Sequence, residues 1–469
     1  MEENKGKMMN DDKIAEYSQK KRGSFTGKIG FVLAASGSAV GLGNLWRFPY
    51  LAAQYGGGIF VLSYILLAAL FGLTLLMLEI AIGRNTGKSV IGAFGKLNKK
   101  FKWFGYVCVA VPIIIVPYYC VIGGWVLKYV FSYIVGSAGL VGGAANTESF
   151  FTGFISSPWQ PLIFFLLFAG VTIAIVAFGV QKGIEKMSKI LMPTLAIIAV
   201  SLMVYVLCQP GAWEGVGYFL IPDFLKFNFN TVLGALGQLF YSLSIGMCIM
   251  ITYGSYMKKD VKITSSSVQI ATFDSLFAII AGTIIIPAVF SFSANPETVL
   301  ESNGPFLMFV QLANVFNSIP VIGRLIGIIF FVLVFFAAVT SSVSLVESIV
   351  AVLCEDGRMK RITACVIVFG IVLVLGTLSS LGYGVLSGVN IFGKDILDTF
   401  DFLANNILMP IVAIVTCVMA GWCIDKTIIP KEIGIDKNKG LNVYFNIIIK
   451  FVAPICILLI LISGLFIKI

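Results

Sequence analysis

Long, uninterrupted blocks of apolar residues recur along this chain, and they constrain its fold more than any other feature. The segments YILLAALFGLTLLMLEIAI (64–82) and FVAPICILLILISGLFI (451–467) are two examples. Each is long enough, as a helix, to cross about 30 Å of hydrocarbon. Hydrocarbon offers no partners to backbone N–H and C=O groups, so such segments have to be helical. Barrel strands would instead show short segments of alternating polarity. The pattern therefore predicts an all-α integral membrane protein.

The composition agrees with this class. Of the 469 residues, 58% are hydrophobic and 12% are charged, whereas about 25% of a soluble protein is charged. We expect eleven membrane spans. They lie at about 27–52, 58–83, 103–133, 158–178, 184–208, 231–256, 262–293, 323–353, 360–378, 396–424 and 442–466.

Cysteine and histidine usage excludes several kinds of site. The nine cysteines show no CxxC pair and no regular spacing. Most lie inside apolar blocks, where a free thiol behaves as a small hydrophobic group, so we predict no disulfide framework and no metal site built on cysteine. The absence of histidine excludes any mechanism that needs an imidazole. The first 26 or so residues are polar and rich in lysine, and no cleavable apolar leader follows them.

The distribution of positive charge predicts the orientation in the membrane. If the N-terminus lies inside, most of the 33 Lys and Arg residues fall in or beside the inner segments. The exceptions are Lys226, Arg324, Lys394 and Lys468 outside and Arg47, Lys128 and Lys450 within spans. Inner loops of membrane proteins carry such an excess of Lys and Arg. We therefore attribute the net charge of +10 to topology and not to a nucleic-acid partner. With eleven spans the C-terminus is then expected outside.

Two of the expected spans have glycine-rich centres. The first contains AASGSAVGLGNLWRFPY (34–50), and the sixth contains GALGQLFYSLSIGMCIMITYGSY (234–256). Glycine and serine weaken a helix and free backbone groups, which a membrane tolerates only where they are buried or bind a ligand. Interrupted spans in corresponding positions of two halves indicate a transporter site at mid-membrane. The alternative is that the small residues only allow close helix packing.

Several motifs carry a resemblance to a known family. They are GSAVGLGNLWRFPY followed by GGGIF, YYCVIGGW, QLFYSLSIGM with ITYGSY, VTSSVSLVE, and DTFDFLAN. At these residues the chain resembles the neurotransmitter:sodium symporter family, whose bacterial representative is the leucine transporter LeuT. The resemblance runs from about Arg22 to the end of span ten. It is closest to the bacterial amino-acid branch, which often lacks a twelfth helix.

The resemblance implies the LeuT fold, which has two inverted repeats of five spans, here followed by one additional helix to give eleven transmembrane helices. The expected parts are a cytoplasmic tail (1–26), a first repeat with spans one to five (27–208), a second repeat with spans six to ten (209–424), and an inner loop with span eleven (425–469). It also implies sodium-coupled symport of an α-amino acid by alternating access in the cell membrane, and no enzymatic activity. The expected partners are the amino acid, sodium and the lipid bilayer.

Two sodium sites are implied by the match to the family pattern. Na⁺ is a hard cation that prefers oxygen ligands, and unwound helix segments offer carbonyl oxygens. The first site would use Ala39, Asn44, Ser242 and Asp274 together with the substrate carboxylate. The second would use the carbonyls of Gly37, Val40 and Ala337 with the hydroxyls of Thr340 and Ser341. Hydroxyls in a helix also often bond their own preceding turn.

Asp274 departs from the common family pattern, which has asparagine there. An ionised aspartate at mid-bilayer costs roughly 2.5–3.5 kcal/mol on insertion scales, so it needs a cationic partner. LeuT has a glutamate one turn further on, where this chain has Ala278. If two Na⁺ offset Asp274 and the substrate carboxylate, transport does not require chloride. The alternative is an aspartate that is neutralised by protonation.

The expected substrate is an α-amino acid with a bulky hydrophobic or aromatic side chain. A helix N-terminus favours an anionic group, so the Leu42 and Gly43 amides are expected to bind its carboxylate, with Tyr119 beside it. Family members that carry monoamines have aspartate where this chain has Gly41. A small neutral amino acid is the alternative substrate. The side-chain pocket is expected to comprise Ser38, Ile115, Phe240, Tyr241, Ser244, Met247, Ser344 and Leu345.

Gates and a hinge are also implied by the resemblance. Arg47 and Asp401 are expected to form the outer gate, bridged by water when it is open. Arg22 is expected to pair with Glu355 or Asp356 at the inner end, near Tyr256, with Phe25 in place of the usual tryptophan. Gly183 and Pro193 match the element of span five that unwinds at its inner end. We interpret Glu79 and Glu347 as structural network residues.

An ion channel is the rival from another class of function. It would need a continuous polar stripe along a pore or a repeated filter, and the sequence shows neither. An enzyme would need a catalytic constellation on one membrane face, and the sequence offers no nucleophile–base pair.

Overall fold

Helices make up almost all of the structure, a computed structural model that describes residues 23–137, 139–141, 146–293, 295–300, 304–319, 321–391 and 393–466. Among these residues, extended pairing is limited to two isolated bridges, Gly57 with Pro222 and Ile391 with Lys394. Nine helices in the described ranges are long and apolar enough to cross a membrane, or ten if a bent pair near the N-terminus counts as one span. The prediction of an all-α membrane protein is confirmed.

The nine long spans lie where the apolar blocks predict them, and most consist of one helix or of a helix continued by a short π-helical turn, labelled η. Four of the nine are single helices. Together the nine are α4 (Gly58–Leu67), η2 (Ala68–Gly72) and α5 (Leu73–Thr86); η3 (Lys99–Phe101, a 3₁₀ turn) and α7 (Phe104–Val135); α9 (Gln160–Ala177); η4 (Val180–Glu185) and α10 (Lys186–Leu207); α14 (Ile263–Phe292); α17 (Gly323–Leu353); α18 (Arg361–Leu381); α19 (Ile396–Asp401), η8 (Phe402–Leu408), α20 (Met409–Val418) and η9 (Met419–Cys423); and α22 (Lys439–Ile447), η10 (Ile448–Val452) and α23 (Ala453–Phe466).

The first predicted span is broken at its glycine-rich centre. Helix α2 (Lys28–Ala39) ends where Val40 takes an extended conformation. A π-helical turn, η1 (Gly43–Arg47), then leads into α3 (Phe48–Gln54), and the chain changes direction by 52°. Pro49, near the start of α3, has no backbone N–H to donate to the preceding helical turn. The break leaves carbonyl and amide groups free in the middle of the protein.

The sixth predicted span is broken as well. Helix α12 (Phe229–Ser242) begins at a capping box made by Asn228, and α13 (Ile249–Ser255) follows after six residues without helical structure. Ser244 and Cys248 in this gap have positive φ angles of 55° and 65°. Neither helix is long enough to cross a membrane by itself, so the total of eleven spans stays a prediction.

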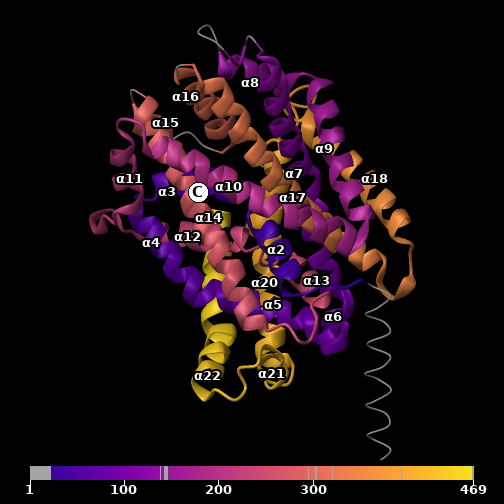
Figure 1. Cartoon of the computed structure of the whole chain (residues 1–469). Helices are drawn as coiled ribbons and strands as arrows, with labels where there is room; N and C mark the ends of the chain where they lie inside the picture. The colour runs from indigo at the N-terminus through magenta and orange to yellow at the C-terminus, as the bar shows by residue number, and fades with distance from the viewer. Residues whose placement is uncertain are drawn as a thin grey trace, which may run out of the picture.

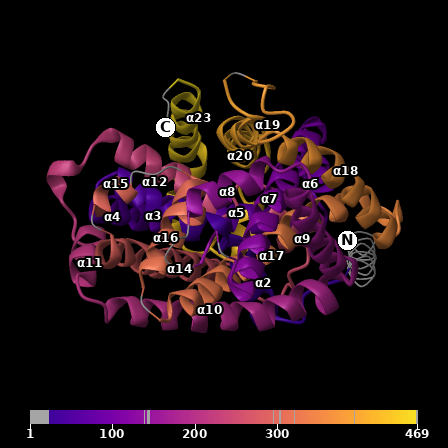
Figure 2. The same cartoon turned by 90° about the horizontal axis from the view of Figure 1, so that it is seen from above.

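The two broken spans lie inside the bundle. Helix α2 packs against α14, α17 and α10, and α13 packs against α5. Figure 1 shows α2, α13 and α14 in the middle, with α9 and α18 along one side. Seen from above, α20 and α23 lie together at one edge (Figure 2), where they pack against each other. Unwound backbone is thus covered by other helices, as a membrane protein requires.

Short helices at the two ends of the bundle do not appear among the predicted spans. Figure 1 shows α8, α15 and α16 at one end and α21 at the other. The short helices outside the long spans are α6 (Val90–Leu97), α8 (Thr147–Ser156), α11 (Ala212–Leu220), α15 (Pro296–Leu300), α16 (Leu312–Ser318) and α21 (Ile428–Ile433), with the turns η5 (Phe224–Lys226), η6 (Leu307–Gln311) and η7 (Glu355–Gly357).

A charged cluster ties α21 to the end of α5. Glu432 accepts hydrogen bonds from Arg84 Nε at 2.6 Å and from Lys259 Nζ at 2.9 Å. The other Arg84 nitrogens bond the backbone carbonyls of Val261 and Glu432. Burial by itself would raise the pKa of Glu432, but the hydrogen bonds and charges of Lys259 and Arg84 outweigh it and lower that pKa. Three segments far apart in sequence are thereby held together.

Candidate substrate and ion site

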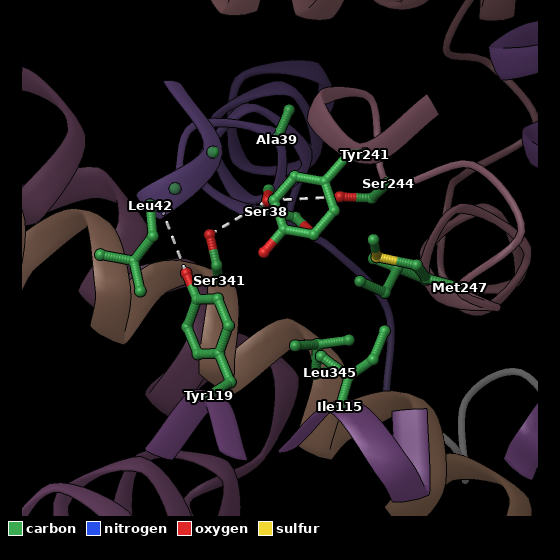
Figure 3. A pocket seen from close by; sticks show the side chains of 13 residues that line it. Ser38, Ala39, Leu42, Ile115, Tyr119, Tyr241, Ser244, Met247, Ser341 and Leu345 are labelled. Atoms are coloured by element: carbon green, nitrogen blue, oxygen red, sulfur yellow. Dashed lines mark hydrogen bonds between the residues drawn. The ribbon is translucent and has the colours of Figure 1, made fainter. Parts of the chain in front are cut away.

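A pocket lies between the two helix breaks. About 330 Å³ of space free of atoms, part of it open to solvent, lies among its lining residues. Figure 3 shows that it is bordered by both broken spans and by residues of α7 and α17. Its lining consists of Ser38, Ala39, Gly41, Leu42, Gly43, Ile115, Tyr119, Tyr241, Ser244, Met247, Ile249, Ser341 and Leu345.

Nine of the eleven predicted substrate residues belong to this lining, and two lie behind it. Phe240 packs against Phe71, with 5.7 Å between the ring centroids. Ser344 accepts a hydrogen bond from Tyr253 Oη at 2.8 Å and donates to the Thr340 carbonyl at 3.0 Å. Ile249 lines the pocket and was missed, because it follows the break and the sequence alone does not show which way α13 starts.

Polar groups gather at the part of the pocket formed by the break of the first span. The Leu42 amide donates to Tyr119 Oη at 3.4 Å, and Ser341 Oγ donates to the Ser38 carbonyl at 3.1 Å. The Ser38 and Ser244 hydroxyls lie 3.3 Å apart across the two breaks (Figure 3). These groups suit a small charged or zwitterionic moiety, since free amides attract anions and free carbonyls attract cations.

Apolar side chains form the remainder of the lining. Ile115, Met247 and Leu345 point toward one another on the side away from Ser38 (Figure 3), and each is at most 5% exposed. Their surfaces offer no hydrogen-bond partners, so a ligand part that lies among them has to be apolar. The pocket is therefore divided into a polar part at the helix breaks and an apolar part between α7, α17 and the end of the sixth-span break.

Asp274 joins the first, sixth and seventh predicted spans. Its Oδ1 accepts hydrogen bonds from Asn44 Nδ2 at 2.8 Å and from Ser242 Oγ at 2.7 Å. Its Oδ2 accepts one from Tyr64 Oη at 2.9 Å. The carboxyl group is fully buried, and buried charge is stable only when it is paired and hydrogen-bonded. Three of the four residues predicted for the first sodium site thus converge, with Ala39 nearby in the pocket lining.

The residues predicted for the second sodium site also converge. Ser341 Oγ lies 3.4 Å from the Gly37 carbonyl oxygen and 3.3 Å from that of Val40. One residue earlier, Thr340 Oγ1 lies 3.0 Å from the Ala337 carbonyl oxygen. Ser341 thus contacts carbonyl oxygens at the end of α2 and Thr340 lies beside Gly37, whereas the bond between Thr340 and Ala337 lies within one turn of α17. Such a set of neutral oxygens is suitable for a hard monovalent cation.

Two contacts at the site were not predicted. Tyr64 reaches Asp274 from α4, and Gln238 Nε2 donates to the Gly43 carbonyl at 3.0 Å. Both residues are fully buried. Buried tyrosine and glutamine need hydrogen-bond partners. A hydroxyl or an amide inside an apolar block of the sequence therefore indicates a buried polar contact, although it does not identify the partner.

The two predicted outer gate residues make contacts other than a direct ion pair. The Arg47 guanidinium lies over the ring of Tyr241, with its central carbon 5.2 Å from the ring centroid. Asp401 accepts a hydrogen bond from Asn405 Nδ2 at 2.7 Å. Within the described ranges no direct ion pair joins Arg47 to Asp401. A water-bridged gate therefore stays a prediction.

The predicted inner gate is described only in part, because Arg22 lies outside the described residues. Glu355 is buried and lies 3.9 Å from Lys88 Nζ, and Asp356 lies 3.2 Å from the same nitrogen. Tyr256 Oη donates to Glu347 Oε1 at 2.7 Å. Phe25 keeps the expected apolar contact, since its ring lies edge-on to Tyr256 with the centroids 6.2 Å apart.

The buried glutamates of the spans have partners in the described part of the chain. Glu347 forms an ion pair with Arg361 at the start of α18. Glu79 Oε1 accepts a hydrogen bond from the Gly246 amide at 2.8 Å. This bond links α5 to the non-helical segment between α12 and α13. These contacts agree with our interpretation of both glutamates as network residues.

The predicted hinge of span five is helical throughout. Gly183 belongs to the π-helical turn η4, and Pro193 lies inside the continuous helix α10. A Cβ atom at Gly183 would collide with the Ile175 carbonyl oxygen, which explains the glycine. Proline removes one helical hydrogen bond at this point. The expected unwinding of this element is not seen in the structure and stays a prediction.

Comparison with known proteins adds an independent finding. The profile of the Sodium:neurotransmitter symporter family matches residues 22–138 and 155–468. The sodium-dependent transporter YhdH of Bacillus subtilis is 37% identical over 451 residues, covering 95% of this chain and 98% of that protein. A sodium-dependent transporter of Methanocaldococcus jannaschii is 31% identical, covering 93% and 89%. The crystal structure of MhsT in complex with L-phenylalanine has a TM-score of 0.85 at 38% identity, covering 94% of this chain and 100% of that one.

Proposed function

The chain belongs to the Sodium:neurotransmitter symporter family, and from that premise we propose that it couples the entry of Na⁺ to the uptake of a hydrophobic or aromatic α-amino acid. Membership makes it a multi-pass membrane transporter that depends on sodium and not an enzyme. The proposal adds the substrate class, two sodium ions per cycle, independence from chloride, and a cell-membrane location with the N-terminus inside.

The observation that carries the proposal is the convergence of Asp274, Asn44 and Ser242 beside a divided pocket. A carboxylate, an amide and a hydroxyl meet within hydrogen-bond distance at the point where two helices are interrupted. Together with the pocket's free carbonyls they make a cation site next to a site for a zwitterion. A substrate carboxylate bound near the Leu42 amide would complete the oxygen shell of the first ion, which links substrate binding to sodium binding.

The substrate class is supported by the shape and polarity of the pocket. Its polar part at the helix breaks suits an ammonium and a carboxylate, and Ile115, Met247 and Leu345 suit an apolar side chain. The structure of MhsT, a protein of similar fold, contains L-phenylalanine. Gly41 has no side-chain carboxylate, so an amine without a carboxylate would leave one charge of the site unmatched. A small neutral amino acid would leave the apolar part of the pocket unfilled.

Charge balance supports independence from chloride. Two Na⁺ bring two positive charges, and an ionised Asp274 with a substrate carboxylate brings two negative ones. Three hydrogen-bond donors hold the buried carboxyl group, and we propose that this group is ionised when sodium is bound. A mobile anion is then not required.

The energy of such coupling is sufficient for uphill transport. A tenfold Na⁺ gradient is worth about 1.4 kcal/mol per ion, and a potential of 100 mV adds about 2.3 kcal/mol per charge. Two ions can therefore drive the accumulation of a neutral zwitterion against roughly 7 kcal/mol.

The test is uptake by the purified protein in liposomes under an inward Na⁺ gradient. Twenty labelled amino acids are compared in sodium chloride, sodium gluconate and potassium chloride. We expect hydrophobic or aromatic amino acids to be taken up with sodium, equally in chloride and gluconate. Uptake that stops in gluconate contradicts chloride independence, uptake only of glycine, alanine or serine contradicts the substrate class, and a sodium-dependent ion current without uptake would indicate a channel.

A further inference from the structure

We propose that the chain holds the headgroup of an anionic phospholipid between Lys426 and Lys450, beside Trp422. This surface lies where η9, at the end of the span that contains α20, meets η10 in the last span. It is separate from the pocket and from every gate residue described above. The occupant we infer is a phospholipid of the leaflet on the side of the lysine-rich loops, with its chains beside Trp422 and Phe451.

The first observation is a lysine that lies inside a membrane span next to another lysine. Lys450 belongs to η10, and the side chain of Lys426 interacts with it as a like charge. Neither ammonium group forms a salt bridge with a carboxylate in the described part of the chain. The nearby Asp425 is engaged by Thr427, whose amide and hydroxyl each lie 2.9 Å from its Oδ1. Two facing cations without an acidic partner favour an added anion.

The second observation is that Trp422 and Gly421 pack directly against the backbone and side chain of Lys450. The Trp422 indole N–H donates to the Lys450 carbonyl at 3.4 Å, and the ammonium lies 5.9 Å from the Trp422 ring centroid. A Cβ atom at Gly421 would lie 2.9 Å from Lys450 Cγ, so the glycine leaves room for the lysine stem. The segment that carries Lys450 is thus held against Trp422, which precedes Lys426 in the same stretch of chain.

The third observation is the position of this surface at a membrane boundary. Trp422 is 59% exposed and Phe451 is 50% exposed, and their rings pack edge to face with centroids 5.5 Å apart. Tryptophan is enriched at the level of lipid headgroups. Asn98 Nδ2 donates to the Cys423 carbonyl at 3.0 Å, which brings the exposed Lys99 and Lys100 to the same surface. Basic pockets between membrane helices on the cytoplasmic side are typical binding sites for anionic headgroups.

Trp422 provides a direct probe of this lipid contact. Brominated acyl chains quench tryptophan fluorescence on contact, so the full-length protein is placed in phosphatidylcholine vesicles that contain increasing fractions of dibrominated phosphatidylglycerol or dibrominated phosphatidylcholine. The signal of Trp422 is the difference between the protein and its Trp422→Phe variant. We expect Trp422 to be quenched at lower fractions of phosphatidylglycerol than of phosphatidylcholine, by roughly fivefold for each lysine that contributes.

Charge variants test which residues are responsible. Lys426→Gln with Lys450→Gln should abolish the preference, whereas Lys450→Arg should keep it. Lys182→Gln with Lys360→Gln removes the same charge from exposed lysines near the start of α18 and should also keep it. Helix α18 lies away from α22 in Figure 1 and from α23 in Figure 2. Elution as a single species and sodium-dependent amino-acid uptake show that each variant is folded.

Three results would overturn the proposal. They are equal quenching by the two lipids, a preference that persists in the double lysine variant, and a preference lost equally in the Lys182 and Lys360 control. Inorganic phosphate is added in a separate arm. If it removes the preference at millimolar concentration, the site binds free phosphate and not a lipid. None of these results depends on which amino acid is transported.

Discussion

The side-chain amide of Asn44 donates to the carboxylate of Asp274 at 2.8 Å, so the break of the first span is tied to the middle of α14. The two residues are 230 positions apart in sequence. A change in the charge of Asp274 therefore acts directly on the segment of the first span that lines the pocket.

Replacing Asp274 with asparagine should make transport depend on chloride. The variant loses the negative charge that offsets one sodium ion, so we expect uptake in gluconate to fall at least about tenfold, equivalent to about 1.4 kcal/mol. Added chloride should restore part of it. The charge-conserving variant Asp274→Glu is the control and should remain insensitive to chloride. Equal uptake by the Asn variant in both salts would contradict the role of the carboxylate.

Replacing Ser341 with alanine should weaken sodium binding. Its Oγ lies within 3.4 Å of carbonyl oxygens of Gly37, Ser38 and Val40, and its loss removes one ligand of the proposed second ion. The sodium concentration for half-maximal uptake should rise roughly tenfold, which corresponds to the loss of one hydrogen-bond-sized interaction. The matched control is Ser342→Ala, because Ser342 Oγ contacts Thr172 and Val339. A similar shift in both variants would show that the effect is not specific to the ion site.

Replacing Gly41 with alanine should block substrate binding. A Cβ atom there would lie 2.5 Å from Ser341 Oγ and 3.1 Å from Tyr119 Oη, inside the polar part of the pocket. We expect the affinity for the amino acid, measured by equilibrium binding with saturating sodium, to fall more than about tenfold. Gly237→Ala is the control, since no atom lies within 4 Å of a Cβ there. Unchanged affinity in Gly41→Ala would exclude this part of the pocket as the substrate site.

Replacing Met247 with phenylalanine should shift selectivity toward smaller side chains. Met247 is 5% exposed and lines the apolar part of the pocket, and a rigid ring takes the place of a flexible thioether. Competition by phenylalanine and tryptophan should weaken about tenfold relative to that by alanine or valine. Phe240→Leu, behind the lining, should leave the ranking of substrates unchanged. The same ranking in Met247→Phe would place the substrate side chain elsewhere.

Replacing Glu432 with glutamine should lower the stability of the protein near neutral pH but not in acid. The pKa of Glu432 is lower in the folded protein than in the unfolded chain, where it is about 4.3. Its stabilising contribution is therefore present above pH values of about 4.3 and is lost as pH falls through the lowered pKa. The melting temperature of the variant should be several degrees below that of the parent at neutral pH, and the difference should shrink as the pH falls through the lowered pKa of Glu432. Asp436→Asn is an exposed control.

A constant difference between Glu432→Gln and the parent at all pH values would contradict the role of the charge. It would indicate that the packing of α21, and not the ion pairs with Arg84 and Lys259, determines the stability of this end.

The long apolar helices could be predicted from sequence because hydrocarbon imposes a minimum length on them. The predicted span 323–353 coincides with α17, and 262–293 differs from α14 by one residue at each end. Both helix breaks were also predicted, since glycine and serine at the centre of an apolar block conflict with a continuous helix. The convergence of Asp274 with Asn44 and Ser242 followed from the resemblance to a family and not from spacing.

The remainder depended on contacts between distant segments. The cluster around Glu432 joins residues up to 348 positions apart, and no local pattern marks it. The short helices α8, α11 and α16 lie in loops whose hydrophobic residues are too few to be recognised as spans. Gly183 and Pro193 suggested unwinding, but the sequence does not reveal that a π-helical turn absorbs the irregularity.

The backbone of residues 243–248 has a consequence for how a ligand is recognised. Ser244 and Cys248 both lie in the left-handed region, which an L-amino acid with a side chain occupies only when its surroundings hold it there. The surrounding helices therefore fix the backbone conformation of this segment before a ligand binds. An amino acid that enters the cavity meets groups already in place, so little conformational entropy is lost on ordering them and more of the contact energy is retained as affinity.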